Sequence, residues 1–230
     1  MNKHNAEDFY NHIADKYNWF FSSWGKIMER QVNQISTILT KYNSKTILDC
    51  SCGNGLQAIG LSKVGYTVDG GDISQEMIDI ASESAKDLDL NIDFKKSNFR
   101  EIEKSFNKKY DVVLSWGNSN HHLMNYENIN EALKSIYNHV EDNGIALLEM
   151  RNYDEMLKNQ KRFLPMRIND IKDGYRYSIL YVFDYLDTVI RFNIIYLIEN
   201  LDTGEKRIET ETVDYNPIKK KSLFIYLKEL

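Results

Sequence analysis

The sequence predicts an α/β fold: a doubly wound, mostly parallel sheet with an N-terminal helical lid and an appended antiparallel meander. Between residues 46 and 154, short apolar runs alternate with amphipathic segments, which is typical of a parallel sheet covered on both faces. A turn of small residues follows the first apolar run. After residue 154 the apolar segments become longer and richer in Tyr, Ile and Phe, which favours antiparallel strands.

The composition is that of a folded protein. The chain has 230 residues, of which 42% are hydrophobic and 27% are charged, enough for one large domain with a sizeable core. We find no linker or repeat and expect a single domain over 1–230. It would consist of a helical lid (1–45), a core (46–154), and an antiparallel substrate-side part with a last helix (155–230).

Charge and cysteine usage exclude several classes of protein. The net charge of −5 is spread along the chain, whereas a nucleic-acid groove needs concentrated positive charge. Cys50 and Cys52 are too close together for a useful disulfide and supply only half of a structural zinc site. No apolar run approaches the roughly 20 residues that span a bilayer. We therefore expect a cytoplasmic protein with no metal, nucleic-acid or membrane partner.

The elements of the lid and core follow from apolar spacing. Residues 6–40 predict helices, because apolar residues such as Phe9, Ile13, Val32 and Ile35 recur every three or four positions. In the core, continuous apolar runs predict strands, and apolar residues at helical spacing predict helices. The strands are expected at 46–49, 66–70, 92–95, 110–116 and 144–150, and the helices at 56–64, from 74 onward and at 129–140.

The last third of the chain predicts a three-stranded meander and a final helix. The strands are expected at 176–185, 189–199 and 205–215, and the helix at 219–230. Turn-like residues separate the strands. The parallel sheet would then end at the strand 144–150, and an open strand edge is a liability. We expect the meander or a second subunit to cover this edge, and we predict a homodimer.

The most informative segment is Asp49-Cys50-Ser51-Cys52-Gly53-Asn54-Gly55, a strand end leading through small residues into a helix. Small residues let backbone amides approach a ligand, and a helix N-terminus favours negative charge. Asp72 ends the next strand, where a carboxylate can accept hydrogen bonds from ribose hydroxyls. Taken singly, each feature has an alternative, namely an unliganded turn for the loop and a helix cap for Asp72. Together they indicate an adenosine-type ligand.

Ser51 stands where a dinucleotide site would have its first glycine, and no phosphate-binding Lys follows. The pattern Asp49, Ser51, Gly53, Gly55 and Asp72 resembles class I S-adenosylmethionine-dependent methyltransferases. That resemblance implies S-adenosylmethionine as cofactor and S-adenosylhomocysteine as product. It lays the glycine loop along the methionine part of the cofactor and places Asp72 on the ribose. The further cofactor contacts that it implies are Ile73, Asn98, Phe99 and Trp116. Ser51 and Asn98 depart from the family's usual Gly and Asp.

Two later segments narrow the resemblance. Gly117-Asn118-Ser119-Asn120-His121-His122-Leu123 and Arg151-Asn152-Tyr153-Asp154 are similar to motifs of glycine N-methyltransferase and the bacterial glycine/sarcosine N-methyltransferases. In that family the Asn and the Arg hold the amino-acid substrate, which implies Asn118, His122 and Arg151 as catalytic residues. An Arg also pairs bidentately with a carboxylate. A structural ion pair for Arg151, turn formation for Asn118 and a structural hydrogen bond for His122 are the alternatives.

The N-terminal arm resembles the lid of the same family. Tyr10 would close over the sulfonium through its ring face, and Arg30 would reach the methionine carboxylate. We expect methyl transfer to a small molecule, above all to the amine of a glycine- or sarcosine-like amino acid. A different small acceptor, or a non-catalytic S-adenosylmethionine-binding protein, is the alternative. The family usually continues after the last helix with a β-hairpin, which we expect to be missing here.

Overall fold

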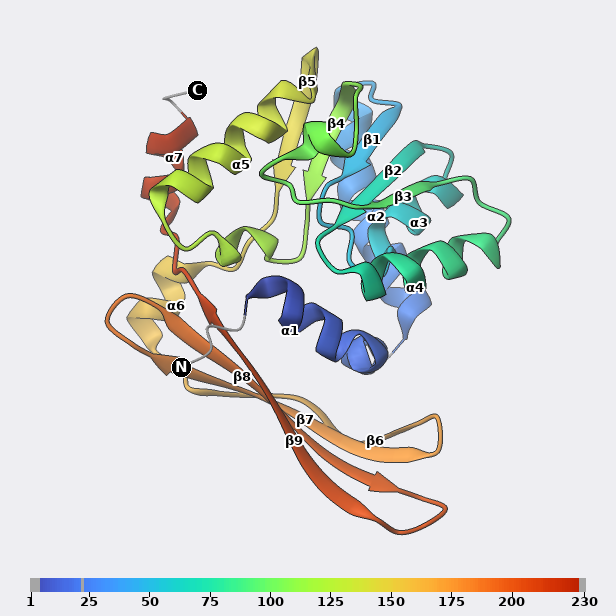
Figure 1. The fold of residues 1–230 in the computed structure, drawn as a ribbon, viewed down its shortest axis with the longest axis vertical. Helices are drawn as coiled ribbons and strands as arrows, with labels where there is room; N and C mark the ends of the chain where they lie inside the picture. The colour runs from blue at the N-terminus through green and yellow to red at the C-terminus, as the bar shows by residue number, and fades with distance from the viewer. Residues whose placement is uncertain (1–4, 22, 228–230) are drawn as a thin grey trace.

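A computed structural model describes residues 5–21 and 23–227 of the chain. Its upper layer in Figure 1 holds a five-stranded sheet in the order β3-β2-β1-β4-β5, in which all neighbouring strands are parallel. The strands are β1 (Thr46–Asp49), β2 (Thr67–Asp72), β3 (Asp93–Lys96), β4 (Tyr110–Ser115) and β5 (Val140–Leu148). Because the winding reverses between β1 and β4, a ligand crevice is expected beyond the carboxyl ends of these strands.

Helices cover both faces of this sheet. On one face lie α2 (Trp24–Lys41), α3 (Leu56–Lys63) and α4 (Gln75–Lys86), and on the other η2 (Ile102–Lys104) and α5 (Tyr126–Asn138). Successive strand residues point to opposite faces, so Ile47 packs with the first set and Leu48 with the second. Both residues are fully buried, which explains the continuous apolar strands of the sequence.

The lower layer is an antiparallel sheet in the order β6-β7-β8-β9. Its strands are β6 (Phe163–Lys172), β7 (Tyr175–Tyr185), β8 (Ile190–Asn200) and β9 (Lys206–Tyr215). Between the two sheets lie α1 (Ala6–Ile13) and η1 (Ala14–Phe20), as Figure 1 shows. The remaining elements are η3 (Ser119–His122), α6 (Tyr153–Asn159) and α7 (Lys220–Leu227). None of the described helices is long and apolar enough to cross a membrane.

The predicted α/β fold with its lid and antiparallel sheet is confirmed, and several boundaries differ. The helical stretch 6–40 divides into α1, η1 and α2, and the helix predicted to reach residue 140 ends at Asn138. The antiparallel sheet has four strands rather than three. β6 and α6 were not predicted, because β6 contains Pro165 and two register shifts that break its alternation. The last three residues of the predicted helix 219–230 lie outside the described residues.

The prediction that the meander covers the open edge of the parallel sheet is wrong. In the described part of the chain, β6 to β9 pair only with one another, and the side of β5 away from β4 has no strand partner. The reason is the lid, because the apolar face of the meander packs against α1 and η1. Cover by a second subunit stays a prediction.

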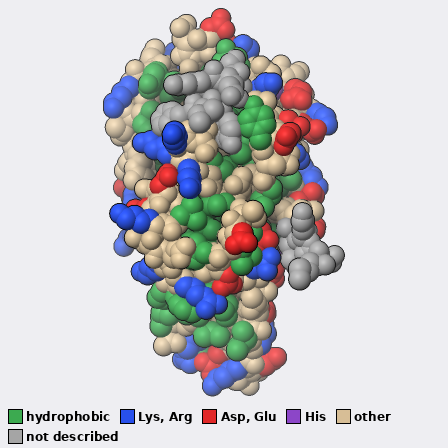
Figure 2. Space-filling view, turned by 90° about the vertical axis from the view of Figure 1, so that its left-hand side faces the viewer, with side chains coloured by type: hydrophobic (Ala, Val, Ile, Leu, Met, Phe, Trp, Pro, Cys, Tyr) green, Lys and Arg blue, Asp and Glu red, His purple; other side chains and the backbone are tan. Residues whose placement is uncertain are grey.

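Exposed apolar side chains on the four-stranded sheet bear on the predicted homodimer. Leu197 and Ile208, which face each other across β8 and β9, are 41% and 70% exposed. Figure 2 shows hydrophobic side chains among Lys and Arg on the lower part of the molecule, which this sheet forms. Such a patch is typical of a protein interface.

We expect sedimentation at micromolar concentration to give twice the mass of one chain. Ile208→Glu should then shift the protein toward a monomer, because it places an unpaired charge in the contact. Val64→Glu, at another exposed apolar residue away from this sheet, is the matched control. A monomer for the unchanged protein contradicts the prediction.

Candidate active site

The turn between β1 and α3 bends around two glycines with positive φ. Gly53 has a φ of 53° and Gly55 a φ of 82°, values that other residues rarely adopt. A Cβ atom on Gly55 would lie 3.0 Å from the Cβ of Ala81, whereas one on Gly53 would meet nothing within 4 Å. Gly55 is therefore required for packing against α4, and Gly53 borders open space.

That space is a cavity of about 1000 Å³ at the carboxyl ends of β1, β2 and β4. The lid closes one side of it with three aromatic rings, those of Tyr10, Tyr17 and Phe21. The other walls include most of the residues predicted to contact the cofactor, namely Ser51, Gly53, Asp72, Ile73, Asn98, Phe99 and Trp116, together with His122. One cavity thus joins the cofactor loop to one of the predicted catalytic residues.

Asp72 holds the glycine loop and still offers acceptors to a ligand. Its side chain is buried, with Oδ2 accepting from the backbone N–H of Gly53 at 2.8 Å and Oδ1 from that of Ser74 at 3.0 Å. Burial raises the pKa of this carboxyl, and the backbone hydrogen bonds oppose the rise. Because each carboxylate oxygen has a second lone pair, Asp72 can accept two further hydroxyl groups.

Ser51 is tied to the end of β4. Its Oγ lies 3.0 Å from the Oγ of Ser115, which in turn accepts from the side-chain amide of Asn120 at 3.3 Å. Ser115 is fully buried and Asn120 is 4% exposed. The hydroxyl that distinguishes this loop from a glycine loop therefore has a partner inside the protein, which explains why serine is accepted at this position.

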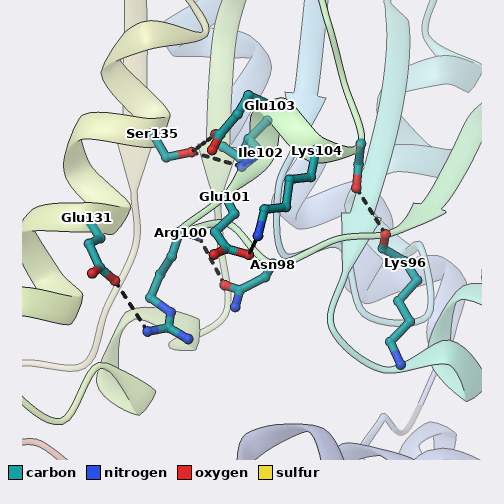
Figure 3. A network of polar contacts seen from close by, with 10 residues as sticks. Lys96, Asn98, Arg100, Glu101, Ile102, Glu103, Lys104, Glu131 and Ser135 are labelled. Atoms are coloured by element: carbon teal, nitrogen blue, oxygen red, sulfur yellow. Dashed lines mark hydrogen bonds and ion pairs between the residues drawn. The ribbon is translucent and has the colours of Figure 1, made fainter.

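The loop after β3 is anchored to α5 through the polar network of Figure 3. Asn98 Oδ1 accepts from the backbone N–H of Arg100 at 3.0 Å, and the Arg100 guanidinium pairs with Glu131 at 3.4 Å. The backbone N–H of Ile102 donates to Ser135 Oγ at 2.9 Å. Asn98 also lines the cavity, where its NH₂ group and the second lone pair of its amide oxygen can meet a ligand.

Two neutral histidines follow β4. Burial lowers the pKa of His122 to about 4, and Nε2 of its ring lies 3.2 Å from the Tyr10 hydroxyl. His121 is fully buried against the ring of Tyr153, with centroids 4.1 Å apart. Burial lowers its pKa to about 3, and its ring nitrogens have no partner among the described residues. Near neutral pH neither histidine adds positive charge beside the cavity.

Asn118 and Arg151 lie together, as the two motifs predict. The side-chain oxygen of Asn118 accepts from the backbone N–H of Arg151 at 2.7 Å. The Arg151 guanidinium lies 5.6 to 5.8 Å from the ring centroids of Tyr181, Phe183 and Phe192. No carboxylate of residues 5–21 and 23–227 forms an ion pair with it. Arg151 is thus a half-buried cation held by aromatic rings.

The region from residue 47 to 144 matches the sequence model of a methyltransferase domain, and its strand order places the cavity where this fold binds ligands. Residues 47–144 are thus similar to a methyltransferase domain, which supports a class I methyltransferase. S-adenosylmethionine is supported as its cofactor by this match. The cavity fits that molecule, with the Asp72 carboxylate for ribose hydroxyls and aromatic rings on the lid side for a sulfonium.

Three known proteins show how far the likeness extends. Glycine/sarcosine N-methyltransferase from Parasynechococcus marenigrum is 25% identical over 155 residues, which are 67% of this chain and 55% of that protein. Ubiquinone biosynthesis O-methyltransferase from Rickettsia canadensis is 30% identical over 125 residues, 54% of this chain and 50% of that protein. The chain thus spans about half the length of the curated relatives it matches.

The third protein is known from a solved structure, that of the S-adenosylmethionine-bound amino pentose methyltransferase from Micromonospora echinaspora. It has a TM-score of 0.74 at 14% identity and covers 94% of this chain and 86% of its own. The shared fold therefore includes the antiparallel sheet as well as the methyltransferase domain.

Several residues predicted for this methyltransferase do not line the cavity. Arg30 is exposed on α2, whose buried face carries Met28 and Val32, so the predicted contact with the methionine carboxylate is not supported. Asp49 is fully buried and does not line the cavity. Burial raises its pKa to about 8. Gly55, Asn118 and Arg151 also lie outside the cavity wall.

Other wall residues were missed. Phe21, Asn54, Gln57 and Met124 line the cavity, as do Thr188, Val189, Arg191 and Thr212 to Asp214 of the antiparallel sheet. Gln57 donates to the side chain of Gln31 on α2 at 2.8 Å. No local signal marks these residues, because they reach the cavity through the packing of elements distant in sequence.

Asp72→Asn should weaken S-adenosylhomocysteine binding about tenfold or more, because a neutral amide replaces charge-assisted hydrogen bonds. Isothermal titration calorimetry measures the change. Asp79→Asn, on the exposed side of α4, is the matched control and should bind as the wild type does. Equal affinity for wild type and Asp72→Asn would contradict the role given to this carboxylate.

Acidification should destabilise the fold through the two buried histidines. Their folded-state pKa values lie below the ordinary value of about 6.5, so the unfolded chain takes up protons that the folded chain does not, from about pH 6.5 down to about 4 for His122 and about 3 for His121. Stability from this source is complete above that window and decreases as the pH falls through it. Each histidine accounts for up to about 2 kcal/mol between pH 7 and 5.

Urea unfolding at pH 7 and pH 5 measures this loss as part of a net change, because the raised pKa of Asp49 stabilises the fold as the pH falls through the same range. His121→Phe should reduce this loss of unfolding free energy by up to about 2 kcal/mol, the contribution of one histidine. The ring nitrogens of His121 have no described hydrogen-bond partners, so the substitution breaks no hydrogen bond of the ring. The exposed His12→Phe is the control and should leave the loss unchanged. An unchanged loss in His121→Phe would show that this histidine is not the source.

Proposed function

We propose that this methyltransferase transfers the methyl group of S-adenosylmethionine to the amine of a small carboxylate-bearing molecule of the glycine or sarcosine type. Arg151 carries the proposal. Its guanidinium is half-buried, lies over three aromatic rings and has no carboxylate partner among the described residues. A planar guanidinium in such surroundings favours a bidentate carboxylate. The similarity to glycine/sarcosine N-methyltransferases supports the same assignment.

In this role the protein positions the substrate amine against the cofactor methyl group and forms no covalent bond to either. S-adenosylmethionine would supply an electrophilic methyl carbon when bound. Arg151 and His122 would hold the substrate so that its amine lone pair faces that carbon. Alignment of the reacting atoms can supply up to about 7–11 kcal/mol of barrier reduction. The lid rings of Tyr10, Tyr17 and Phe21 exclude water from the cavity.

His122 orients the amine in this proposal. It lines the cavity, and its pKa of about 4 keeps it neutral, so one ring nitrogen can accept a hydrogen bond from an amine N–H. A base of such low pKa holds a proton poorly near neutral pH. We therefore assign His122 the role of orienting the amine, and solvent the role of final proton acceptor. Tyr10, at 3.2 Å from Nε2, fixes the ring.

A different small acceptor is the second candidate, and the size of the cavity favours it. The volume of about 1000 Å³ exceeds what the cofactor and glycine require, and the antiparallel sheet and its β7–β8 turn add the polar residues Thr188, Arg191 and Asp214 to the wall. Relatives of similar identity include an O-methyltransferase. A panel of amines, amino acids, amino sugars and phenols, assayed with methyl-labelled cofactor, separates the candidates and also tests for a non-catalytic binder.

Arg151→Lys is the sharper test of the carboxylate. It should raise the KM of the acceptor about tenfold, because lysine cannot reproduce the bidentate geometry, while the affinity for S-adenosylhomocysteine changes less. Steady-state kinetics and calorimetry on the same protein measure both. Arg162→Lys, at an exposed arginine paired with Asp184, is the control. An unchanged acceptor KM would assign Arg151 to structure and favour an acceptor without a carboxylate.

A further inference from the structure

We infer that Asn18 is a positioning residue of the cofactor site: its side chain holds Asn54 in the glycine loop and so fixes the lid over the bound cofactor. The inference rests on the proposed use of S-adenosylmethionine and adds a residue that does not itself touch the cavity wall. Asn54 Nδ2 donates to Asn18 Oδ1 at 2.9 Å, across 36 positions of the sequence.

Asn54 depends on this contact. It lies between Gly53 and Gly55, lines the cavity and is only 2% exposed. Its side-chain amide has no other hydrogen-bond partner within the described ranges 5–21 and 23–227. A buried donor that loses its acceptor keeps the full desolvation penalty. Removal of the Asn18 oxygen therefore disturbs the loop itself, next to the residue whose N–H binds Asp72.

Asn18 is in turn fixed by the antiparallel sheet. Its backbone carbonyl accepts from Lys172 Nζ at 3.3 Å, and the carbonyl of Phe20 accepts from the Arg167 guanidinium at 2.9 Å. These cations lie at the C-terminal end of η1, where the helix dipole favours positive charge. Between them Trp19 stacks on Tyr177 with centroids 4.5 Å apart. The position of Asn18 is therefore set by β6 and β7.

The seam between lid and methyltransferase domain contains few polar contacts. Two part-buried hydrogen bonds cross it, one between Asn18 and Asn54 and one between Tyr10 and His122. A third, between Glu7 and Lys96, is exposed to solvent. Tyr17, the neighbour of Asn18 in the chain, places its ring in the cavity wall. Asn18 thus connects the sheet that holds the lid to the loop that holds the cofactor. Loss of its contact should let the cofactor leave faster without changing how it enters.

Two nearly isosteric variants test this. Asn18→Leu keeps the size of the side chain and removes the acceptor, while Asn18→Asp keeps an acceptor oxygen. Stopped-flow measurement of S-adenosylhomocysteine binding should give about tenfold faster dissociation for Asn18→Leu, with association within about twofold of wild type. Asn18→Asp should stay within about threefold of wild type in both. Asn33→Leu, at an exposed position of α2, is the control and should change neither rate.

A double-mutant cycle separates positioning from a general structural role. If Asn18 acts through Asn54, then Asn18→Leu in an Asn54→Ala background should add no further increase in the dissociation rate. An independent increase, an unchanged rate in Asn18→Leu, or an equal loss in Asn18→Asp overturns the inference. Wild-type protein that binds no S-adenosylhomocysteine overturns the proposed function as well, so the two failures are distinguishable.

Discussion

The packing of α1 and η1 against the inner face of β7, β8 and β9 determines where the residues that cover the cavity lie. Phe9, Ile13 and Phe20 are buried in one cluster with inner-face residues such as Phe192 and Tyr196. Each such side chain contributes about 1.5–3 kcal/mol by its burial, whereas a single hydrogen bond contributes about 0.5–1.5 kcal/mol. The lid is therefore held mainly by the antiparallel sheet. Its few polar contacts with the parallel layer add little to its stability and instead set its position over the cavity.

This arrangement also sets the electrostatics of the cavity. The lid and the sheet surround the histidine motif with rings, so His121 and His122 are desolvated and neutral, and burial raises the pKa values of Tyr10 and Tyr215. A sulfonium cofactor brings its own positive charge, and neutral histidines do not repel it. In the proposed binding mode, the Asp72 carboxylate would accept hydrogen bonds from the ribose hydroxyls and lie away from the methyl group.

The parallel layer was predictable because its signals are local. Strands buried on both faces read as continuous apolar runs, and the glycine loop and Asp72 stand at fixed positions relative to them. The antiparallel sheet was only partly predictable, since β6 carries Pro165 and two register shifts. Contacts between distant segments were not predictable at all. Asn18 has no periodic or motif signal, and the exposure of Arg30 follows from the direction in which α2 packs.

The same inner face of the antiparallel sheet connects the lid to Arg151. Tyr181 and Phe183 on β7 and Phe192 on β8 project from this face, and Phe183 and Phe192 are cross-strand neighbours. The guanidinium that they hold comes from the loop after β5, so the candidate acceptor site is assembled from both layers.

The cofactor cavity, by contrast, takes most of its walls from residues 47–144, with the lid as its cover and, in our inference, as the anchor of Asn54. In the proposed function, cofactor binding and acceptor choice therefore rest mainly on different residues. A substitution at Arg151 should act first on the acceptor, and one in the glycine loop or at Asp72 should act first on the cofactor.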